Sequence, residues 1–370
     1  MLFYSNLQSS MAHLQTLQLH QFRNIHQAEL HFGPGLNLLV GDNAAGKTSV
    51  IESLWLLASG RSFRSHKPQQ LIELEQKQLV LFCEVMQHDR HYKLGLQRDH
   101  QGLTLKINAE KQPSQSEFAR HLPIQLLTPE SHRLLEEGPK ARRQFLDWGC
   151  FYHYPEFMPN WRHYSRALKQ RNMNLKNPEN RRDAAIWNPI MIEAGHSINQ
   201  LRQRYLKEIT PYILAFCERL MPELHTQAEF QFYPGWPATK PDFANLLHDN
   251  LQRDIQLGFT QYGCHRADIK IKINKNEPLI GLSRGQQKLF VCALLLAQAR
   301  FLAEQTQDSV IMLIDDLPAE LDLSHRINLL KLLDELKIQH LITTTALDLI
   351  PNPNECRAFQ IHQGVIKPIN

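Results

Sequence analysis

The residues with the clearest chemical meaning form a glycine-rich stretch near the N-terminus. Residues 41–48 read Gly-Asp-Asn-Ala-Ala-Gly-Lys-Thr and match the pattern G-x-x-x-x-G-K-[ST]. An apolar run at 36–40 precedes this stretch and an amphipathic segment follows it, so it should join a strand to a helix. Its glycines let successive backbone N–H groups face phosphate oxygens at the positive end of the helix dipole. We expect a nucleotide phosphate site formed by Gly41, Asp42, Asn43, Ala44, Ala45, Gly46, Lys47, Thr48 and Ser49.

Four side chains should act directly on the bound nucleotide. Lys47 is placed to reach the β- and γ-phosphates, and Thr48 to bind Mg²⁺. A partner carboxylate should end another buried strand at the same edge of the sheet, and the apolar run 310–314 ends in an aspartate pair. We expect Asp315 to lie on the Mg²⁺ side and Asp316 to act as the general base, which makes Lys47 and Asp316 the catalytic candidates. Aspartate pairs also end strands simply as turn formers.

A third motif narrows the class of nucleotide-binding protein. A phosphate loop alone would suit a kinase, a GTPase or a motor. The sequence Leu-Ser-Arg-Gly-Gln at 282–286 stands at the head of a long apolar helix, shortly before the strand that ends in Asp315. It resembles the L-S-G-G-Q signature of ABC-type ATPases with Arg284 in place of one glycine, although such a stretch can also be a plain serine cap. The run 315–322 keeps both ends of the pattern D-E-P-T-x-x-L-D, with Asp322 at the D-loop position.

The resemblance to ABC-type ATPases implies a site shared between two chains. In that class the signature helix is too far from its own phosphate loop to complete the site, so it closes over the ATP of a second protomer. The resemblance therefore implies that Ser283 and Gly285 donate hydrogen bonds to a γ-phosphate. ATP with Mg²⁺ would hold a homodimer together, and loss of the γ-phosphate would weaken the dimer interface. The ATP-binding residues implied in this way are Ser283, Gly285, Gln286 and Asp322.

The spacing of the motifs points to one branch of this class. Between Thr48 and Leu282 lie far more residues than a transport cassette places there, yet no coiled coil of the kind found in SMC-like proteins is present. The chain resembles the RecF family of DNA-repair ATPases. The stretches that carry the resemblance are 22–25, 41–48, 60–64, 128–131, 142–147, 265–268 and 282–288.

The RecF resemblance implies both a function and further site residues. It implies ATP-dependent dimerisation on double-stranded and gapped DNA, with slow hydrolysis. It also implies cooperation with RecR and RecO in placing RecA on gapped DNA, in the cytoplasm and near the nucleoid. By position, Arg23 and Asn24 would lie near the nucleotide, and Arg61 and Arg64 near the phosphates or the adenine.

The sequence departs from the broader ABC pattern in three places and from the RecF pattern in one. No Q-loop glutamine is found, because Thr128-Pro129 occupies its place, and the switch histidine is replaced within 343–345. Asp316 stands where many relatives carry glutamate, and Cys264 stands where the family's G-P-H-R stretch has proline. The shorter carboxylate and the missing histidine are compatible with slow turnover.

These motifs need a framework of strands and helices to position them. Hydrophobic patterning predicts helices at 47–58 and 283–303, with mostly helical sequence from a start at Thr128-Pro129 to about 258. The strands at 310–314 and 341–342 should be buried and parallel, because they are continuous apolar runs. Further strands are expected at 14–19, 28–32, 36–40, 79–86, 92–97, 103–107, 124–127 and 269–273.

The order of these elements predicts an α/β fold split by an insertion. We expect an ABC-type P-loop ATPase head without a coiled coil, formed by residues 11–130 and 260–370. Residues 131–259 should form a mainly helical inserted lobe. Residues 1–10 should be a disordered N-terminal extension, and Met11 is a second candidate for the start of the chain.

Positive charge gathers in the expected insertion. Residues 140–204 contain twelve Lys or Arg against five Asp or Glu, in a chain whose net charge is only +4. Arg162, Arg166 and Lys169 fall on a helix face next to the one that carries Trp161, Tyr164 and Leu168. The helix should therefore pack on the insertion with its apolar face and expose its cations to solvent. With Arg142 and Arg143 they are the candidate DNA contacts, although a basic face can also be merely solvated. The aromatic residues Trp148, Phe151, Tyr152 and Tyr154 fit a core better than a base-stacking platform.

Composition excludes several other classes of protein. With 42% apolar and 21% charged residues the chain should bury a core unaided. The six cysteines form no C-x-x-C pair, and the apolar run 290–297 is far shorter than the roughly 20 residues of a membrane helix. We therefore expect no membrane contact. Two alternatives remain open: a transport cassette, which would need a membrane subunit, and a DNA clamp that binds ATP without hydrolysing it.

Overall fold

The computed structural model describes residues 13–222, 228–237, 239, 242–306, 308–351 and 356–369. The expected N-terminal extension therefore lies outside the described residues. By its internal contacts the chain divides into two compact units. We call residues 1–131 with 288–370 the split unit, and residues 132–287 the inserted unit.

The second boundary between the units differs from the one that the sequence suggests. The sequence predicted that the insertion ends at 259, whereas residues 260–287 pack with the inserted unit. The reason is a two-stranded antiparallel sheet in which β10 (Asp268–Ile273) pairs along its length with β9 (Ala228–Tyr233). The expected strand at 269–273 is thus present, but its partner belongs to the insertion.

The split unit contains an antiparallel sheet in the strand order β2-β1-β4-β5-β6-β7. Leu14, Leu17 and Leu19 of its strand β1 are fully buried, because they face the core of the unit. The strands are β1 (His13–Phe22), β2 (Ile25–His31), β4 (Gln78–Gln87), β5 (Arg90–Asp99), β6 (Leu103–Ile107) and β7 (Glu110–Lys111). The expected strands in this part of the chain are confirmed.

A second, mostly parallel sheet of the split unit has the order β14-β13-β3-β12-β11-β8. Its strands are β3 (Leu36–Val40), β8 (Ile124–Leu127), β11 (Ile311–Ile314), β12 (Gln339–Thr344), β13 (Arg357–His362) and β14 (Val365–Ile369). Strands β3, β12 and β11 are parallel neighbours, as their continuous apolar runs predict. Residues 41, 345 and 315, which follow these three strands directly, therefore emerge at one edge of the sheet.

Helix α1 (Lys47–Ser59) packs into the core that the two sheets share. Val50, Ile51 and Leu57 are fully buried together with residues of both sheets, so the helix is covered on more sides than the single apolar face predicted from the sequence. The other helices of this unit are α2 (Gln115–Ala119), α11 (Leu317–Glu320) and α12 (Leu323–Glu335).

Helix α10 (Arg284–Thr306) begins at the end of the inserted unit and continues into the split unit. Among the described residues it is the one helix long and apolar enough to cross a membrane, and 72% of its most apolar window is buried within the structure. A mostly buried helix of this kind is typical of a protein core.

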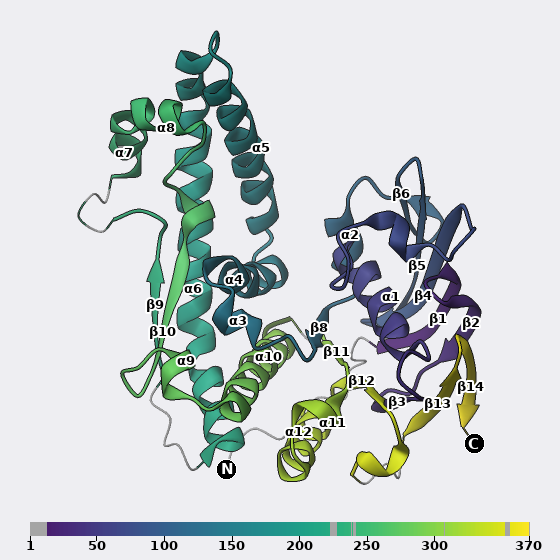
Figure 1. Ribbon diagram of the computed structural model, residues 1–370. Helices are drawn as coiled ribbons and strands as arrows, with labels where there is room; N and C mark the ends of the chain where they lie inside the picture. The colour runs from purple at the N-terminus through teal and green to yellow at the C-terminus, as the bar shows by residue number, and fades with distance from the viewer. Residues whose placement is uncertain are drawn as a thin grey trace. The chain divides into compact units, whose positions relative to one another are not determined.

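The inserted unit is mainly helical, with α5 (Phe157–Lys176) and α6 (Asn188–Leu220) lying side by side (Figure 1). Its other helices are α3 (Arg133–Glu136), α4 (Pro139–His153), α7 (Phe243–Asp249), α8 (Leu251–Leu257) and α9 (Pro278–Gly281). The helix start predicted at Thr128-Pro129 is wrong: the N–H of Thr128 donates to Ser131 Oγ at 2.7 Å, which closes a turn, and the first helix begins at Arg133.

A fully buried arginine ties together three segments of the inserted unit. Arg171 of α5 donates to Asp254 Oδ2 of α8 at 2.7 Å and to Thr260 Oγ1 at 2.6 Å. It also donates to Asn188 Oδ1, at the start of α6, at 3.0 Å. Because a buried charge is tolerated only when it is paired, these contacts fix how the segments meet.

Replacing Arg171 by leucine should destabilise the inserted unit strongly. The substitution leaves Asp254 as an uncompensated buried charge, which costs about 3–5 kcal/mol of unfolding free energy. Urea denaturation followed by tryptophan fluorescence measures this loss. Arg166→Leu is the matched control, since Arg166 is exposed on the same helix and its loss should cost no more than about 0.5 kcal/mol. Equal losses in the two variants would contradict the account.

Candidate nucleotide-binding site

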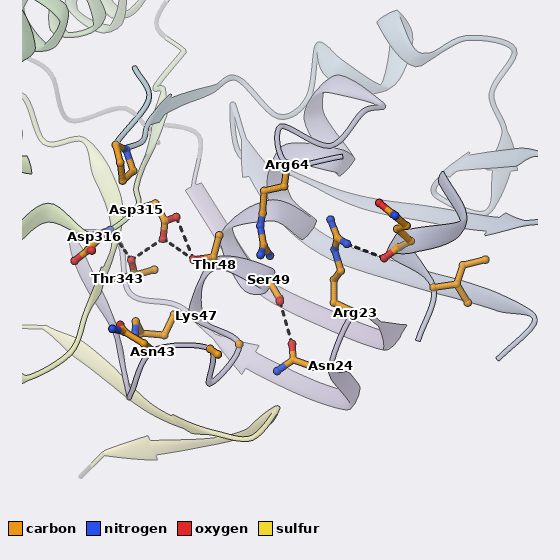
Figure 2. Close-up of a pocket in the computed structure, with 15 residues that line it drawn as sticks. Arg23, Asn24, Asn43, Lys47, Thr48, Ser49, Arg64, Asp315, Asp316 and Thr343 are labelled. Atoms are coloured by element: carbon orange, nitrogen blue, oxygen red, sulfur yellow. Dashed lines mark hydrogen bonds between the residues drawn. The ribbon is translucent and has the colours of Figure 1, made fainter. Parts of the chain in front are cut away.

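A pocket of about 620 Å³ lies in the split unit at the carboxyl ends of its parallel strands (Figure 2). It brings together most of the residues that the sequence assigned to the nucleotide. The lining residues are Arg23, Asn24, Asn43, Ala44, Gly46, Lys47, Thr48, Ser49, Arg64, Gln70, Ile72, Pro129, Asp315, Asp316 and Thr343. Outside the signature segment and the D-loop position, four predicted residues are not among them: Gly41, Asp42, Ala45 and Arg61.

Three of these four residues belong to the phosphate loop and stabilise it through their carbonyl groups, but do not line the pocket. The ammonium group of Lys47 donates to the carbonyl oxygens of Gly41 at 2.6 Å and of Asp42 at 2.9 Å. The carbonyl of Ala45 accepts from the side-chain amide of Asn24 at 3.2 Å. Arg61, in contrast, is exposed at the surface.

Two opposing electrostatic effects act on the pKa of Lys47. Burial lowers the pKa of its ammonium group, while the charges of Asp316, Asp315 and Asp42 act in the opposite direction. A cation that is partly desolvated and held by backbone carbonyls gains from a phosphate, which offers full negative charge at close range.

Thr48 and Asp315 form the oxygen-rich end of the pocket. Thr48 Oγ1 lies 3.1 Å from both carboxylate oxygens of Asp315. Burial raises the pKa of Asp315, and the hydrogen bonds from Thr343 and Thr48 partly offset this effect. A hydroxyl and a carboxylate fit Mg²⁺, which binds few protein ligands and takes the rest from phosphates and water. The described residues contain no group of three or more His, Cys, Asp or Glu that could hold a metal.

Thr343 stands out among the three threonines that replace the expected switch histidine. Its hydroxyl donates to Asp315 Oδ1 at 2.8 Å and accepts from the N–H of Asp316 at 2.7 Å. Thr344 instead turns its hydroxyl to the carbonyl of Ala346 at 2.9 Å. Thr343 therefore orients both aspartates, and it lines the pocket where Thr344 does not.

Asp316 adopts a strained backbone conformation. Its φ of 55° and ψ of 54° lie in the left-handed region, which residues with a side chain rarely adopt. Such strain costs about 1–3 kcal/mol and is typical of functional sites. In Figure 2 the Asp316 side chain lies near Lys47 and Thr343, at the pocket that it lines.

Glu52, a fully buried carboxylate on α1, was not among the site residues predicted from the sequence. Glu52 accepts a two-point contact from Arg23, at 2.9 and 2.5 Å, and lies 3.5 Å from Arg64. The hydroxyl of Ser62 also donates to it. Glu52 thus positions both arginines that line the pocket, and an acidic residue within the apolar sequence of α1 was the one pattern that could have revealed it.

The turn between β13 and β14 also supports the phosphate loop, and no local pattern predicted this contact. The N–H of Gly364 donates to the carbonyl of Ala45 at 2.8 Å, and a Cβ at 364 would collide with the carbonyl oxygen of Asn24. A Cβ at Gly41 would likewise collide with the carbonyl oxygen of Ile361. Glycine is needed at both positions because two backbone segments touch there.

Replacing Gly364 by alanine should weaken ATP binding. The φ of Gly364 is +80°, and the new methyl group would push on Asn24, which holds the loop. Strain of about 1–3 kcal/mol corresponds to an affinity loss of about 5- to 150-fold. Equilibrium binding of a fluorescent ATP analogue with Mg²⁺ measures it. In the control Gly35→Ala a Cβ meets nothing within 4 Å, so affinity should stay unchanged. Unchanged affinity in Gly364→Ala would contradict the account.

The signature segment begins helix α10 with a reciprocal cap. Ser283 Oγ accepts from the N–H of Gln286 at 3.3 Å, and Gln286 Oε1 accepts from the N–H of Ser283 at 2.8 Å. The serine is therefore a helix cap, yet its hydroxyl proton stays available for a further acceptor. Asp322 caps α12 in a similar way, and hydrogen bonds from His325 and Ser324 lower its pKa to about 2. None of these residues is among those that line the pocket.

Gly285 has no role in the fold of its own chain. A Cβ at this position would meet nothing within 4 Å, and its φ lies outside the left-handed region. Glycine within a helix costs about 0.5–1 kcal/mol relative to alanine. A glycine that the fold does not require leaves the backbone open to a molecule outside the chain.

The candidate DNA contacts fall into two groups. Arg162, Arg166 and Lys169 are exposed on α5, as predicted. Arg142 instead forms a two-point contact with Asp268, at 2.8 and 2.9 Å, and Arg143 donates to the carbonyl of Ala267 at 2.7 Å. These two arginines therefore hold the start of β10 against α4.

The aromatic residues of α4 and α5 follow the prediction only in part. Tyr154 and Tyr164 are buried, and the ring of Tyr152 packs 4.7 Å from that of Trp148. The side chain of Trp161 was expected to face the core, but it is 42% exposed, because it lies on the outer side of α5.

Comparison with known proteins decides the family. The family described as RecF/RecN/SMC N terminal domain matches residues 13–367. The DNA replication and repair protein RecF of Hydrogenovibrio crunogenus is 54% identical over 356 residues, which cover 96% of this chain and 98% of that protein. The chain belongs to the RecF family. The RecF resemblance noted in the sequence is thereby confirmed.

Solved structures agree with this assignment and with the predicted fold. The recombination mediator protein RecF-ATP of the RecFOR pathway is 25% identical, with a TM-score of 0.87 over 99% of this chain and 100% of that one. An Smc head bound to the C-winged helix domain of ScpA has a TM-score of 0.62 at 14% identity, over 96% of each chain. The predicted α/β head of the ABC type is confirmed, and no coiled coil is present in the described part of the chain.

Proposed function

We propose that this RecF-family protein is a DNA-repair ATPase that binds ATP with Mg²⁺ and dimerises around it on DNA. The observation that carries the proposal is the environment of Gly285. This glycine leaves the backbone at the start of α10 accessible, although the fold of its own chain does not need it. The ATP part is supported by the pocket and by the similarity to a RecF structure with ATP.

Within the pocket, each residue has a proposed role. Lys47 binds the β- and γ-phosphates after leaving the carbonyls of Gly41 and Asp42. Thr48 and Asp315 hold Mg²⁺, which when bound neutralises charge on the phosphates. Asp316 takes a proton from the attacking water as general base. Thr343 fixes both aspartates through hydrogen bonds and has no titratable group of its own, which supports slow turnover.

The proposed dimer places the signature segment of one chain on the ATP of the other. Ser283 can donate its hydroxyl proton to a γ-phosphate while its oxygen still caps α10. The N–H of Gly285 can approach the same phosphate because no side chain stands in the way. ATP bound by both chains then joins them, and loss of the γ-phosphate removes these contacts.

Two substitutions in the signature segment test the dimer. Gly285→Ala should raise the free energy of unfolding by about 0.5–1 kcal/mol, because alanine favours the helix, and yet weaken ATP-dependent dimerisation. Ser283→Arg should leave ATP binding by monomers intact and prevent dimers. Sedimentation velocity with ATP and Mg²⁺, together with urea unfolding, measures both effects. Normal ATP-dependent dimers of either variant would refute the shared site.

We further propose that the protein binds double-stranded and gapped DNA and acts with RecR and RecO to place RecA. The names of the relatives, which are DNA replication and repair proteins, support this role, as does the RecFOR pathway of the similar RecF structure. Within the chain, the support is the basic segment 140–204 and the exposed cations Arg162, Arg166 and Lys169. Arg142 and Arg143 are secondary candidates, since both are already engaged by the β10 region.

Neutralising the exposed cations of α5 should weaken DNA binding without changing sequence preference. The triple variant Arg162→Gln, Arg166→Gln, Lys169→Gln should reduce the slope of log affinity against log salt by about 0.9 for each lost phosphate contact. Fluorescence anisotropy on two unrelated duplexes, at several salt concentrations with ATP, measures the slope. Lys331→Gln, at an exposed position of α12, is the control and should leave the slope unchanged. An unchanged slope in the triple variant would remove α5 from the DNA site.

A further inference from the structure

Arg284 is the residue that departs from the glycine of the signature motif, and the fold of the chain gives no reason for it. It stands at the first position of α10, where the positive end of the helix dipole makes a cation unfavourable. The first turn of α10 contains no acidic residue that would offset this charge. With Gly285 beside it, the helix begins with two residues that both weaken it.

In this structure the guanidinium of Arg284 is held by Glu136, at the end of α3. Arg284 Nη1 donates to Glu136 Oε1 at 2.5 Å, and both residues belong to the inserted unit. The side chain of Arg284 is 73% exposed and that of Glu136 is 33% exposed. An ion pair as open to water as this one contributes little stability, so Arg284 can exchange Glu136 for a stronger partner.

Glu136 does not depend on Arg284 for its own stability. Its other carboxylate oxygen, Oε2, lies 3.5 Å from Nε2 of His132, the residue before α3, and the group remains partly hydrated. Arg284, in contrast, lies between Ser283 and Gly285, the two residues that we assign to the γ-phosphate of a second chain. A triphosphate carries more charge than one carboxylate and accepts two parallel hydrogen bonds from a guanidinium, so it would displace Glu136.

Resting on the proposed dimer, we propose that Arg284 is a ligand for the triphosphate bound by the partner chain, and that Glu136 occupies its guanidinium until the dimer forms. The carboxylate of Glu136 then competes with ATP for the same cation. Arg284 promotes the dimer and Glu136 opposes it, so the pair sets how readily bound ATP brings two chains together.

The proposal predicts effects of opposite sign for the two members of one ion pair. With a non-hydrolysable ATP analogue and Mg²⁺, Arg284→Ala should raise the dimer dissociation constant about tenfold, the equivalent of about 1.4 kcal/mol. Glu136→Gln should lower it severalfold, because it releases the arginine. In the double variant Glu136→Gln should have no further effect. Sedimentation velocity over a range of protein concentrations measures each constant, and nucleotide binding by the monomers should be the same in all variants.

A neighbouring glutamate provides the matched control. Glu137 lies next to Glu136 in the chain and faces Arg133 at 3.7 Å, so Glu137→Gln changes the net charge equally without touching Arg284. Its dimer constant should match that of the unchanged protein. If Arg284→Ala and Glu136→Gln shift the constant in the same direction, or if Glu136→Gln behaves like Glu137→Gln, the inference is overturned while the dimer stands. If the unchanged protein forms no dimer with the analogue, the proposed function fails first, and this inference fails with it.

Discussion

Three parallel strands that end at one edge of a sheet determine the chemistry of this protein. Strand β12 pairs with β3 on one side and with β11 on the other. The phosphate loop follows β3, Thr343 lies near the end of β12, and Asp315 follows β11. Because the strands are in parallel register, these groups meet within hydrogen-bond distance although they are far apart in the chain. A shift of one strand would separate the threonine hydroxyls from the carboxylate that both contact.

Local patterns were sufficient to predict the parts of the site that lie within one segment. The phosphate loop was recognisable because glycine, lysine and threonine stand at fixed offsets between a strand and a helix. Asp315 was recognisable because it ends a run of buried apolar residues. The sequence alone did not indicate which of the three threonines contacts Asp315, because this depends on the register between strands. Its hydroxyl contacts Asp315, whereas that of Thr344 contacts Ala346.

Other features could not be predicted because they depend on contacts between distant segments. Gly364 supports the loop across more than three hundred residues of chain, and nothing in its own neighbourhood indicates that role. The charge of Arg142 suggested a DNA contact, but its guanidinium is held by Asp268. Asp268 begins β10, which pairs with β9 and therefore belongs to the inserted unit. Glu52 looked like a polar interruption of a helix, whereas burial makes it the anchor of two arginines.

The first turn of α10 contains two residues, Arg284 and Gly285, that the fold of the chain does not need and that therefore indicate function. Glycine and arginine side by side in a first helical turn both weaken the helix; a Cβ at Gly285 would meet nothing, and Arg284 gains only an exposed ion pair with Glu136. Proteins tolerate such losses where a ligand or a partner gains from them. The proposed shared ATP site would explain both residues at once, whereas a plain serine cap explains only Ser283.

Subunit mixing tests the shared site most directly. Lys47→Ala should disable the phosphate loop of a chain and leave its signature segment intact, while Ser283→Arg does the reverse. Mixed with ATP and Mg²⁺, the two variants can form one complete site, from the loop of one chain and the signature of the other. Energy transfer between differently labelled variants should therefore report ATP-dependent pairs in the mixture, and neither variant alone should form them. A mixture in which ATP brings no labelled pairs together would contradict the account.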